Sequence, residues 1–309
     1  MSSSDNRTPS QPAPAAAPAV TPALVACQGI EGAYSHLAAR SLFPDSSLLY
    51  FRNFRAVARA VSQGMCRYGV LPIENNTYGS VREVYRVIGE ENVCIVRSTT
   101  LRISHRLLAL PGASLSGITT IYSHEQALGQ CADFLHSLGD KVRVVPCLNT
   151  AVAARTVAQG GDPHAAAISS PECAALYDLR TLKKDIADTT HNYTRFICIA
   201  AAPEILPGAS RLSIVLSVQH RPGALAAVLQ EFAKAGIDML KIESAPVPGR
   251  DFEFRFYIDL AATVSDPAVT AILQRLEAEC PEYRYLGSYT EEKVPEAAPS
   301  PSPILQNML

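Results

Sequence analysis

A threonine followed directly by an arginine, Thr194-Arg195, is the pair in this sequence best suited to chemistry. It lies between a polar approach, residues 185–190, and an apolar run, residues 196–202. The apolar run predicts a buried strand, so we expect both side chains at a strand entrance facing a cleft. Arginine binds a carboxylate through two parallel charge-assisted hydrogen bonds, and threonine adds a small neutral donor. The pair suits an acidic small molecule, although a surface ion pair beside a β-forming threonine is the common alternative.

Polar side chains also follow other predicted strands or open the next helix. Glu74 and Asn75 end one such strand, and Gln126 lies in the first turn of a helix. In α/β sheets these positions surround the ligand site, whereas polar turns and helix caps are the structural alternative. No histidine stands four residues after His124, so the HExxH spacing of zinc proteases is absent. The other candidates at strand ends and helix starts are Ser35, Ser80, Ser123, His124 and Thr150.

Composition excludes several classes of protein. The 309 residues carry a net charge of −2 and no basic stripe, so we expect neither nucleic acid nor a membrane surface as partner. No apolar stretch is long enough to span a bilayer. The eight cysteines are scattered and form no CxxC pair, which is typical of reduced thiols in a cytoplasmic protein.

Alternating strand and helix patterns predict two α/β units, one before and one after residue 102. The last strand of this region, residues 195–201, is expected to return to the first unit, so that two lobes enclose a cleft. The expected helices include residues 54–63, 81–88, 126–138 and 151–159. The other expected strands are residues 24–28, 48–51, 68–73, 94–101, 103–110, 118–122, 143–147 and 165–169.

A separate pattern follows a linker at residues 203–210. Strands at 211–218, 238–244, 252–260 and 283–287 alternate with helices at 222–235 and 267–279, which is the ferredoxin-like order βαββαβ. Residues 1–22 and 290–309 are rich in proline and alanine and predict a disordered leader and a flexible tail. Residues 24–27 resemble a lipoprotein cleavage box, but four prolines interrupt the preceding segment, which also lacks a charged start. A transit peptide stays open as an alternative.

With these pieces in order, the chain resembles the prephenate dehydratases that carry a C-terminal ACT domain. The resemblance covers roughly residues 24–289. It implies a two-lobed, periplasmic-binding-protein-like α/β domain at 23–202, with crossovers near 102 and 190, and a ferredoxin-like ACT domain at 211–289. No chorismate mutase helices are expected before Leu24, so the family member would be monofunctional. The segments that carry the resemblance are GIEGAYS at 29–35, GVLPIEN at 69–75, GSV at 79–81, SHEQAL at 123–128 and NYTRF at 192–196.

The resemblance implies conversion of prephenate to phenylpyruvate, with loss of water and carbon dioxide and without a metal or organic cofactor. Thr194 would donate a hydrogen bond or proton to the leaving hydroxyl, and Arg195 would bind a carboxylate. Asn75 and Gln126 would hold the substrate from opposite lobes, and Glu74 would be either a second acid or a structural partner of Arg195. The expected substrate-binding residues are Ser35, Ser80, Ser123, His124 and Thr150.

The ACT resemblance rests on residues 221–225 and 242–246. It implies an allosteric L-phenylalanine site between ACT domains of a homodimer or homotetramer. Two positions depart from the family pattern: Ala245 stands where arginine is usual, and Asp238 where asparagine is common. Phenylalanine is therefore expected to bind mainly through backbone groups. The expected effector-binding residues are Gly223, Ala224, Leu225, Asp238, Glu243 and Ser244.

Two other functions stay open at this point. Arogenate dehydratase performs the same chemistry on the aminated substrate, and the sequence does not separate the two. A non-catalytic sensor is the alternative from a different class, because two lobes around a cleft also describe solute-binding proteins. A pure binder need not keep Asn75, Gln126, Thr194 and Arg195 together.

Overall fold

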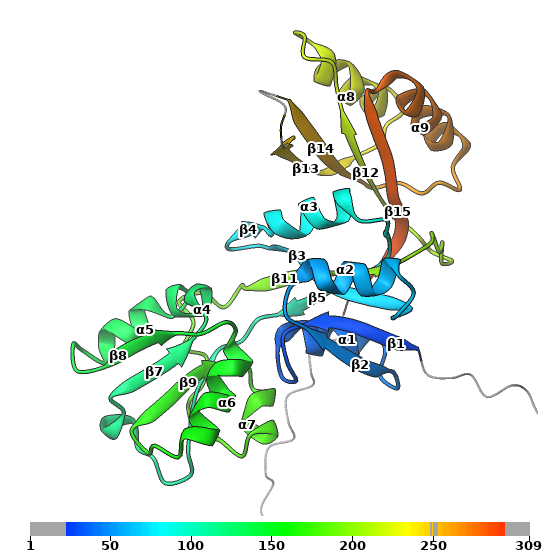
Figure 1. Cartoon of the computed structure of the whole chain (residues 1–309). Coiled ribbons are helices and arrows are strands. Elements are labelled where there is room, and N and C mark those ends of the chain that lie inside the picture. Colours follow the sequence, from blue (N-terminus) through cyan, green and yellow to red (C-terminus); the bar gives the residue numbers. More distant parts are fainter. Residues whose placement is uncertain (1–22, 248, 250–252, 294–309) are drawn as a thin grey trace, which may run out of the picture.

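The strand–helix alternation builds two lobes, and a third domain sits on the first of them (Figure 1). The computed structural model describes residues 23–247, 249 and 253–293, so the expected leader at 1–22 lies outside the described residues. The two-lobed α/β architecture with a βαββαβ domain after it is confirmed. The chain passes between the lobes at residues 103–105 and 184–192.

The first lobe contains a mixed sheet in the order β5-β11-β3-β1-β2. Strands β1, β2 and β3 are parallel, but β11 runs antiparallel to both β3 and β5, because it returns from the second lobe. Helix α2 buries Val57 and Val61 against this sheet, and Asn53 caps its start by accepting from the Ala56 amide. The elements are β1 (Leu24–Gln28), α1 (Tyr34–Leu42), β2 (Ser47–Phe51), α2 (Phe54–Ser62), β3 (Tyr68–Asn75), β4 (Gly79–Ser80), α3 (Arg82–Glu90), β5 (Cys94–Arg102) and β11 (Tyr193–Ala200).

The second lobe is a five-stranded sheet in the order β10-β6-β9-β7-β8. The single helix expected at 126–138 is two helices, because the Asp188 carboxylate accepts from the amides of Ala132 and Asp133 and so starts a new helix. Strand β10 was not foreseen, since it is a short polar edge strand. The elements are β6 (Arg106–Ala109), the 3-10 helix η1 (Leu115–Gly117), β7 (Thr120–Ser123), α4 (Glu125–Gly129), α5 (Ala132–Ser137), β8 (Arg143–Pro146), α6 (Thr150–Gly160), β9 (Ala165–Ser169), α7 (Glu172–Leu176) and β10 (Arg180–Lys183).

The C-terminal domain places its sheet between its own helices and the first lobe (Figure 1). Phe232 and Leu276 of the helices pack on one face of the sheet, whereas Tyr257 and Tyr289 on the other face join the core of the first lobe. The elements are β12 (Arg211–Ser217), α8 (Ala224–Lys234), β13 (Met239–Pro246), β14 (Phe254–Leu260), α9 (Pro267–Glu279) and β15 (Glu282–Lys293).

Strand β15 joins the sheet of the C-terminal domain to the sheet of the first lobe, so that the two are continuous. It pairs antiparallel with β12 and then parallel with β5, from Thr290 opposite Arg97 to Lys293 opposite Thr100. The flexible tail expected from residue 290 is therefore wrong for residues 290–293, because backbone pairing with β5 outweighs their polar composition. Residues 294–309 lie outside the described part of the chain.

Gly287 is the tightest point of this junction. Its φ is +151°, and a Cβ there would overlap the backbone carbonyl of Ile95. We expect Gly287→Ala to lower the free energy of unfolding by about 3 kcal/mol or more, because backbone cannot yield as a side chain does. Gly160→Ala, at an open position in α6, is the control and should be neutral or slightly stabilising. Thermal unfolding checks both variants, and equal melting temperatures would contradict the expected clash.

None of the described helices is long and apolar enough to cross a membrane. All eight cysteines are free thiols. Burial raises the pKa of Cys27 and of Cys131 to about 12, so these two remain protonated and unreactive at neutral pH.

Candidate active site

A pocket of about 530 Å³ lies between the two lobes, and this volume would hold a small organic molecule. Thr194, Asn75 and Phe196 line it from the first lobe, on the paired strands β11 and β3. Gln126 and His124 line it from the second lobe, at the start of α4. Tyr78 spans the cleft, since its hydroxyl donates to the carbonyl of Gln126 at 3.3 Å.

The hydroxyl of Thr194 is oriented by Asn75. The Asn75 Nδ2 donates to Thr194 Oγ1 at 2.9 Å and to Asn192 Oδ1 at 2.7 Å, and its Oδ1 accepts from the amides of Thr77 and Tyr78. Because Thr194 Oγ1 accepts this bond, its own proton is left to donate into the pocket. Asn75 therefore holds Thr194 and the turn after β3, and most of the hydrogen-bonding capacity of its side-chain amide is used in these contacts.

Arg195 does not face the pocket, and our expectation that both members of the pair face the cleft is wrong on this point. Neighbouring side chains of a strand point to opposite faces, so Thr194 in the pocket puts Arg195 on the far side of the sheet. There its Nε donates to Glu74 at 2.5 Å and its Nη2 to Asp259 at 2.7 Å. The side chain is only 5% exposed. Glu74 was expected to be either a second acid or a structural partner of Arg195, and in the structure it is the partner of Arg195.

These ion pairs keep both partners charged. Burial alone raises the pKa of the Glu74 carboxyl, but Arg195 and Lys241 outweigh it and hold that pKa below its ordinary value. Burial likewise works against the Arg195 guanidinium, whose pKa is nevertheless raised by Tyr289, Asp259 and Glu74.

The structure brings together most, but not all, of the other predicted site residues. Ser35, His124, Gln126 and Thr150 line the pocket. Ser80 also lines it, but its hydroxyl donates to Glu243 of the C-terminal domain at 2.6 Å. Ser123 does not line the pocket: it is fully buried, and its hydroxyl donates to the carbonyl of Ile168.

Arg82 is a pocket residue that sequence reasoning missed. Its side chain is 89% exposed, and its Nε lies 3.9 Å from Glu243. It directly follows the GSV segment at the start of α3, so the motif itself marked its position. The described residues that line the pocket include no aspartate or glutamate. Other lining residues not foreseen include Gln28, Tyr34, Phe54, Tyr78, His105, Gln130, Leu148, Asn149 and Phe196.

The electrostatics of the pocket favour an anion. Helices α1, α3 and α6 begin at its wall, at Tyr34, Arg82 and Thr150, and helix starts present unpaired amides and a positive dipole end. Burial lowers the pKa of His105, which a hydrogen bond with Gln130 opposes, and burial also lowers the pKa of His124. Both imidazoles are therefore neutral at pH 7, and Arg82 is the full positive charge among the described lining residues.

No cluster of histidine, cysteine, aspartate and glutamate in the described residues could hold a metal ion. The pocket therefore offers hydrogen-bond donors, helix starts and one guanidinium, which can bind and orient an acidic molecule and assist a leaving oxygen.

Comparison with known families identifies both parts of the chain. Residues 25–204 match the prephenate dehydratase family, and residues 212–278 match the ACT domain family. The chain belongs to the prephenate dehydratase family. Its catalytic domain is that of a hydro-lyase, a carbon–oxygen lyase, and the two matches agree with the lobes and the βαββαβ domain described above.

Similar proteins include enzymes of related but different specificity. The Arabidopsis thaliana chloroplastic arogenate dehydratase/prephenate dehydratase 2 is 37% identical over 277 residues, which are 86% of this chain and 72% of the relative. A prephenate dehydratase from Arthrobacter aurescens, solved in complex with L-Phe, is 29% identical with a TM-score of 0.80, covering 86% of this chain and 90% of that one. A structure described as GqqA, a novel type of quorum quenching acylase, is 29% identical with a TM-score of 0.78, covering 87% and 98%.

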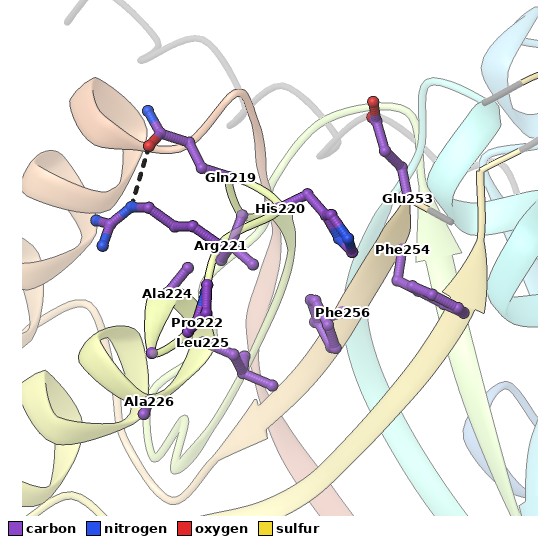
Figure 2. A pocket seen from close by; sticks show the side chains of 12 residues that line it. Gln219, His220, Arg221, Pro222, Ala224, Leu225, Ala226, Glu253, Phe254 and Phe256 are labelled. Atoms are coloured by element: carbon purple, nitrogen blue, oxygen red, sulfur yellow. Dashed lines mark hydrogen bonds between the residues drawn. The ribbon is translucent and has the colours of Figure 1, made fainter. Parts of the chain in front are cut away.

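The ACT domain contains a second pocket of about 430 Å³, between the start of α8 and strand β14 (Figure 2). Gly223, Ala224 and Leu225 line it as expected for an effector site, and Phe254 and Phe256 form an apolar wall. Gly223 has a φ of +80°, a conformation that favours glycine, where it caps α8.

The other three expected effector residues do not line this pocket. Glu243 instead contacts Ser80 at the rim of the interlobe pocket, and Ser244 lies on edge strand β13. Asp238 precedes that strand. Within one chain these residues are thus separated from Gly223, so a shared effector site would need a second ACT domain.

Proposed function

We propose that this protein converts prephenate to phenylpyruvate in the interlobe pocket and that L-phenylalanine controls the reaction through the ACT domain. The observation that carries the proposal is the Thr194 hydroxyl, oriented by Asn75, in a pocket lined by three helix starts and Arg82. Prephenate matches this lining because it has two carboxylates and a ring hydroxyl. The family membership supports the same reaction.

The reaction requires positioning more than a strong catalyst. The bond from the ring to its carboxylate breaks, carbon dioxide leaves, and the electron pair of that bond completes the aromatic ring. The bond between ring carbon and hydroxyl oxygen breaks on the opposite side, and the departing hydroxide takes a proton to become water. Thr194 donates a hydrogen bond, or the proton itself, to this oxygen, and regains the proton from solvent. Holding a reactive conformer contributes several kcal/mol, roughly, to lowering the barrier.

The same lining favours prephenate over arogenate. Arogenate carries an ammonium group in place of the keto oxygen, and the described lining residues include no carboxylate. The carboxylate at the rim, Glu243, already accepts from Ser80 and lies 3.9 Å from Arg82. We therefore expect kcat/KM for prephenate to exceed that for arogenate by roughly tenfold or more, since an unpaired charge in a pocket costs affinity. Both substrates are measured on one preparation, and a higher value for arogenate would transfer the proposal to that substrate.

The test of the function is phenylpyruvate formation from prephenate by the full chain. Turnover supports the proposal, and turnover of arogenate alone supports the related enzyme. Failure on both substrates by a folded protein would leave the non-catalytic sensor as the better explanation.

L-Phenylalanine is the proposed effector because the ACT pocket combines a glycine-capped helix start with two phenylalanine side chains. The helix start suits a carboxylate, and the aromatic wall suits a phenyl ring. We further propose a homodimer or homotetramer, since Leu240 and Ile242 lie exposed on edge strand β13. The eight free thiols, five of them buried, support a reducing compartment such as the cytoplasm.

A further inference from the structure

Two neighbouring rungs of the β3–β11 ladder carry different chemistry on their two faces. Thr194 pairs with Asn75, and Arg195 pairs with Glu74. On the pocket face the first pair is joined by the 2.9 Å bond that orients the Thr194 hydroxyl. On the opposite face the second pair is joined by the 2.5 Å ion pair. Both pairs are carried by the same two backbone segments, so a backbone shift at the outer pair is passed on to the inner pair.

The outer pair is held from the ACT domain. Arg195 Nη2 donates to Asp259 Oδ2 of β14 at 2.7 Å, and Arg195 Nη1 donates to the Tyr289 hydroxyl of β15 at 3.3 Å. Asp259 is 8% exposed and also accepts from Ser213 at 2.6 Å. A buried ion pair adds little net stability, because desolvation offsets the attraction, but removing one partner leaves a costly unpaired charge. The contact is therefore suited to fixing one geometry.

Strand β13 adds a second connection. Lys241 stands opposite Asp259 in the β13–β14 ladder and forms an ion pair with Glu74. Lys241, Glu74, Arg195 and Asp259 thus form a cluster of alternating charge, which we call the interdomain cluster. Two ACT residues and two catalytic-domain residues contribute to it equally.

The interdomain cluster shares a strand with the effector pocket. Phe254 and Phe256 line that pocket on β14, and Asp259 follows three residues after Phe256 on the same strand, about 10 Å away. Figure 2 shows Phe254 and Phe256 beside the start of α8, and Figure 1 shows β14 crossing above α3. Strand β14 therefore connects the two sites directly.

We propose that Arg195 is a positioning residue, through which the ACT domain sets the orientation of Thr194. The interdomain cluster holds the outer face of the two rungs, and the inner face presents the Thr194 hydroxyl to the substrate. Effector binding at β14 acts on turnover through this cluster. This inference rests on the proposed function and assigns the path of its regulation.

Asp259→Asn tests the proposal, because it removes one charge of the cluster without touching the pocket. We expect kcat for prephenate to fall roughly tenfold or more, with KM within about a factor of two, since small displacements of a reacting group cost rate more than binding. We also expect phenylalanine to lose its effect on rate while still binding, as measured by calorimetry. Lys241→Gln is the second variant: its side chain is 19% exposed, so it threatens folding less.

Glu292→Gln is the matched control. Glu292 forms a different cross-domain ion pair, with Arg97 at 3.6 Å, and contacts neither rung. It should keep the wild-type kcat and phenylalanine response. Wild-type kcat in both Asp259→Asn and Lys241→Gln would overturn the proposal. An equal fall of kcat in Glu292→Gln would also overturn it, because it would indicate that any weakened contact between the domains lowers turnover. Absence of prephenate turnover in the wild type would instead overturn the proposed function on which this inference rests.

Discussion

Replacing Thr194 by alanine is expected to lower kcat for prephenate by roughly 10²–10⁴-fold, the usual contribution of a positioned proton donor. KM should change little, because the carboxylates of the substrate bind elsewhere in the pocket. The reason lies in the geometry: Asn75 Nδ2 donates to Thr194 Oγ1, so the hydroxyl proton is directed away from Asn75 and is free to be donated. Steady-state kinetics on the purified variant measure both constants.

Thr194→Ser is the control for this change. Serine keeps the hydroxyl and loses only the methyl group, so it should retain most of the turnover. Circular dichroism and thermal unfolding establish that both variants fold. A rise in KM with unchanged kcat in Thr194→Ala would contradict the donor role, since it would show that Thr194 only binds the substrate.

Arg82→Gln is expected to raise KM for prephenate by roughly 10–150-fold, the equivalent of one charge-assisted hydrogen bond of about 1.5–3 kcal/mol. Arg82 is the guanidinium that lines the interlobe pocket, whereas Arg195 is turned toward the ACT domain. A substrate with two carboxylates should therefore depend on Arg82. High salt should weaken binding to the wild type more than to the variant.

Arg86→Gln is the matched control for Arg82. Arg86 is exposed on the same helix, one turn further on, and it is absent from the pocket lining. Loss of its charge should leave KM near the wild-type value. Equal effects of the two substitutions would indicate long-range attraction of the substrate by net charge, and would argue against a contact between Arg82 and a carboxylate.

The local pattern of the sequence was sufficient to predict most elements. The apolar run after Thr194, the asparagine caps at Asn53 and Asn149, and the glycine-rich turns act over a few residues, so their effects are visible in the chain itself. The motif residues Ser35, Gln126, Thr150 and Thr194 do meet at one pocket, because strand ends and helix starts of the two lobes gather at the sheet edges that face each other across the cleft.

Three outcomes were decided only by tertiary structure. Besides Glu74, Arg195 pairs with Asp259, 64 residues away on another domain, and no local pattern marks a contact of that kind. Residues 290–293 are a strand because β5 offers them a partner. Glu243 contacts Ser80 because β13 lies across the rim of the pocket.

The direction in which the Arg195 side chain points depends on both the local sequence and the tertiary packing. The strand period of two dictates that Thr194 and Arg195 point to opposite sides, which the sequence alone already implied. Which side was the pocket, and which the buried ion pair, depended on how the ACT domain packs on the first lobe. Sequence sets the alternation of side chains along a strand, and only packing decides what each face of that strand meets.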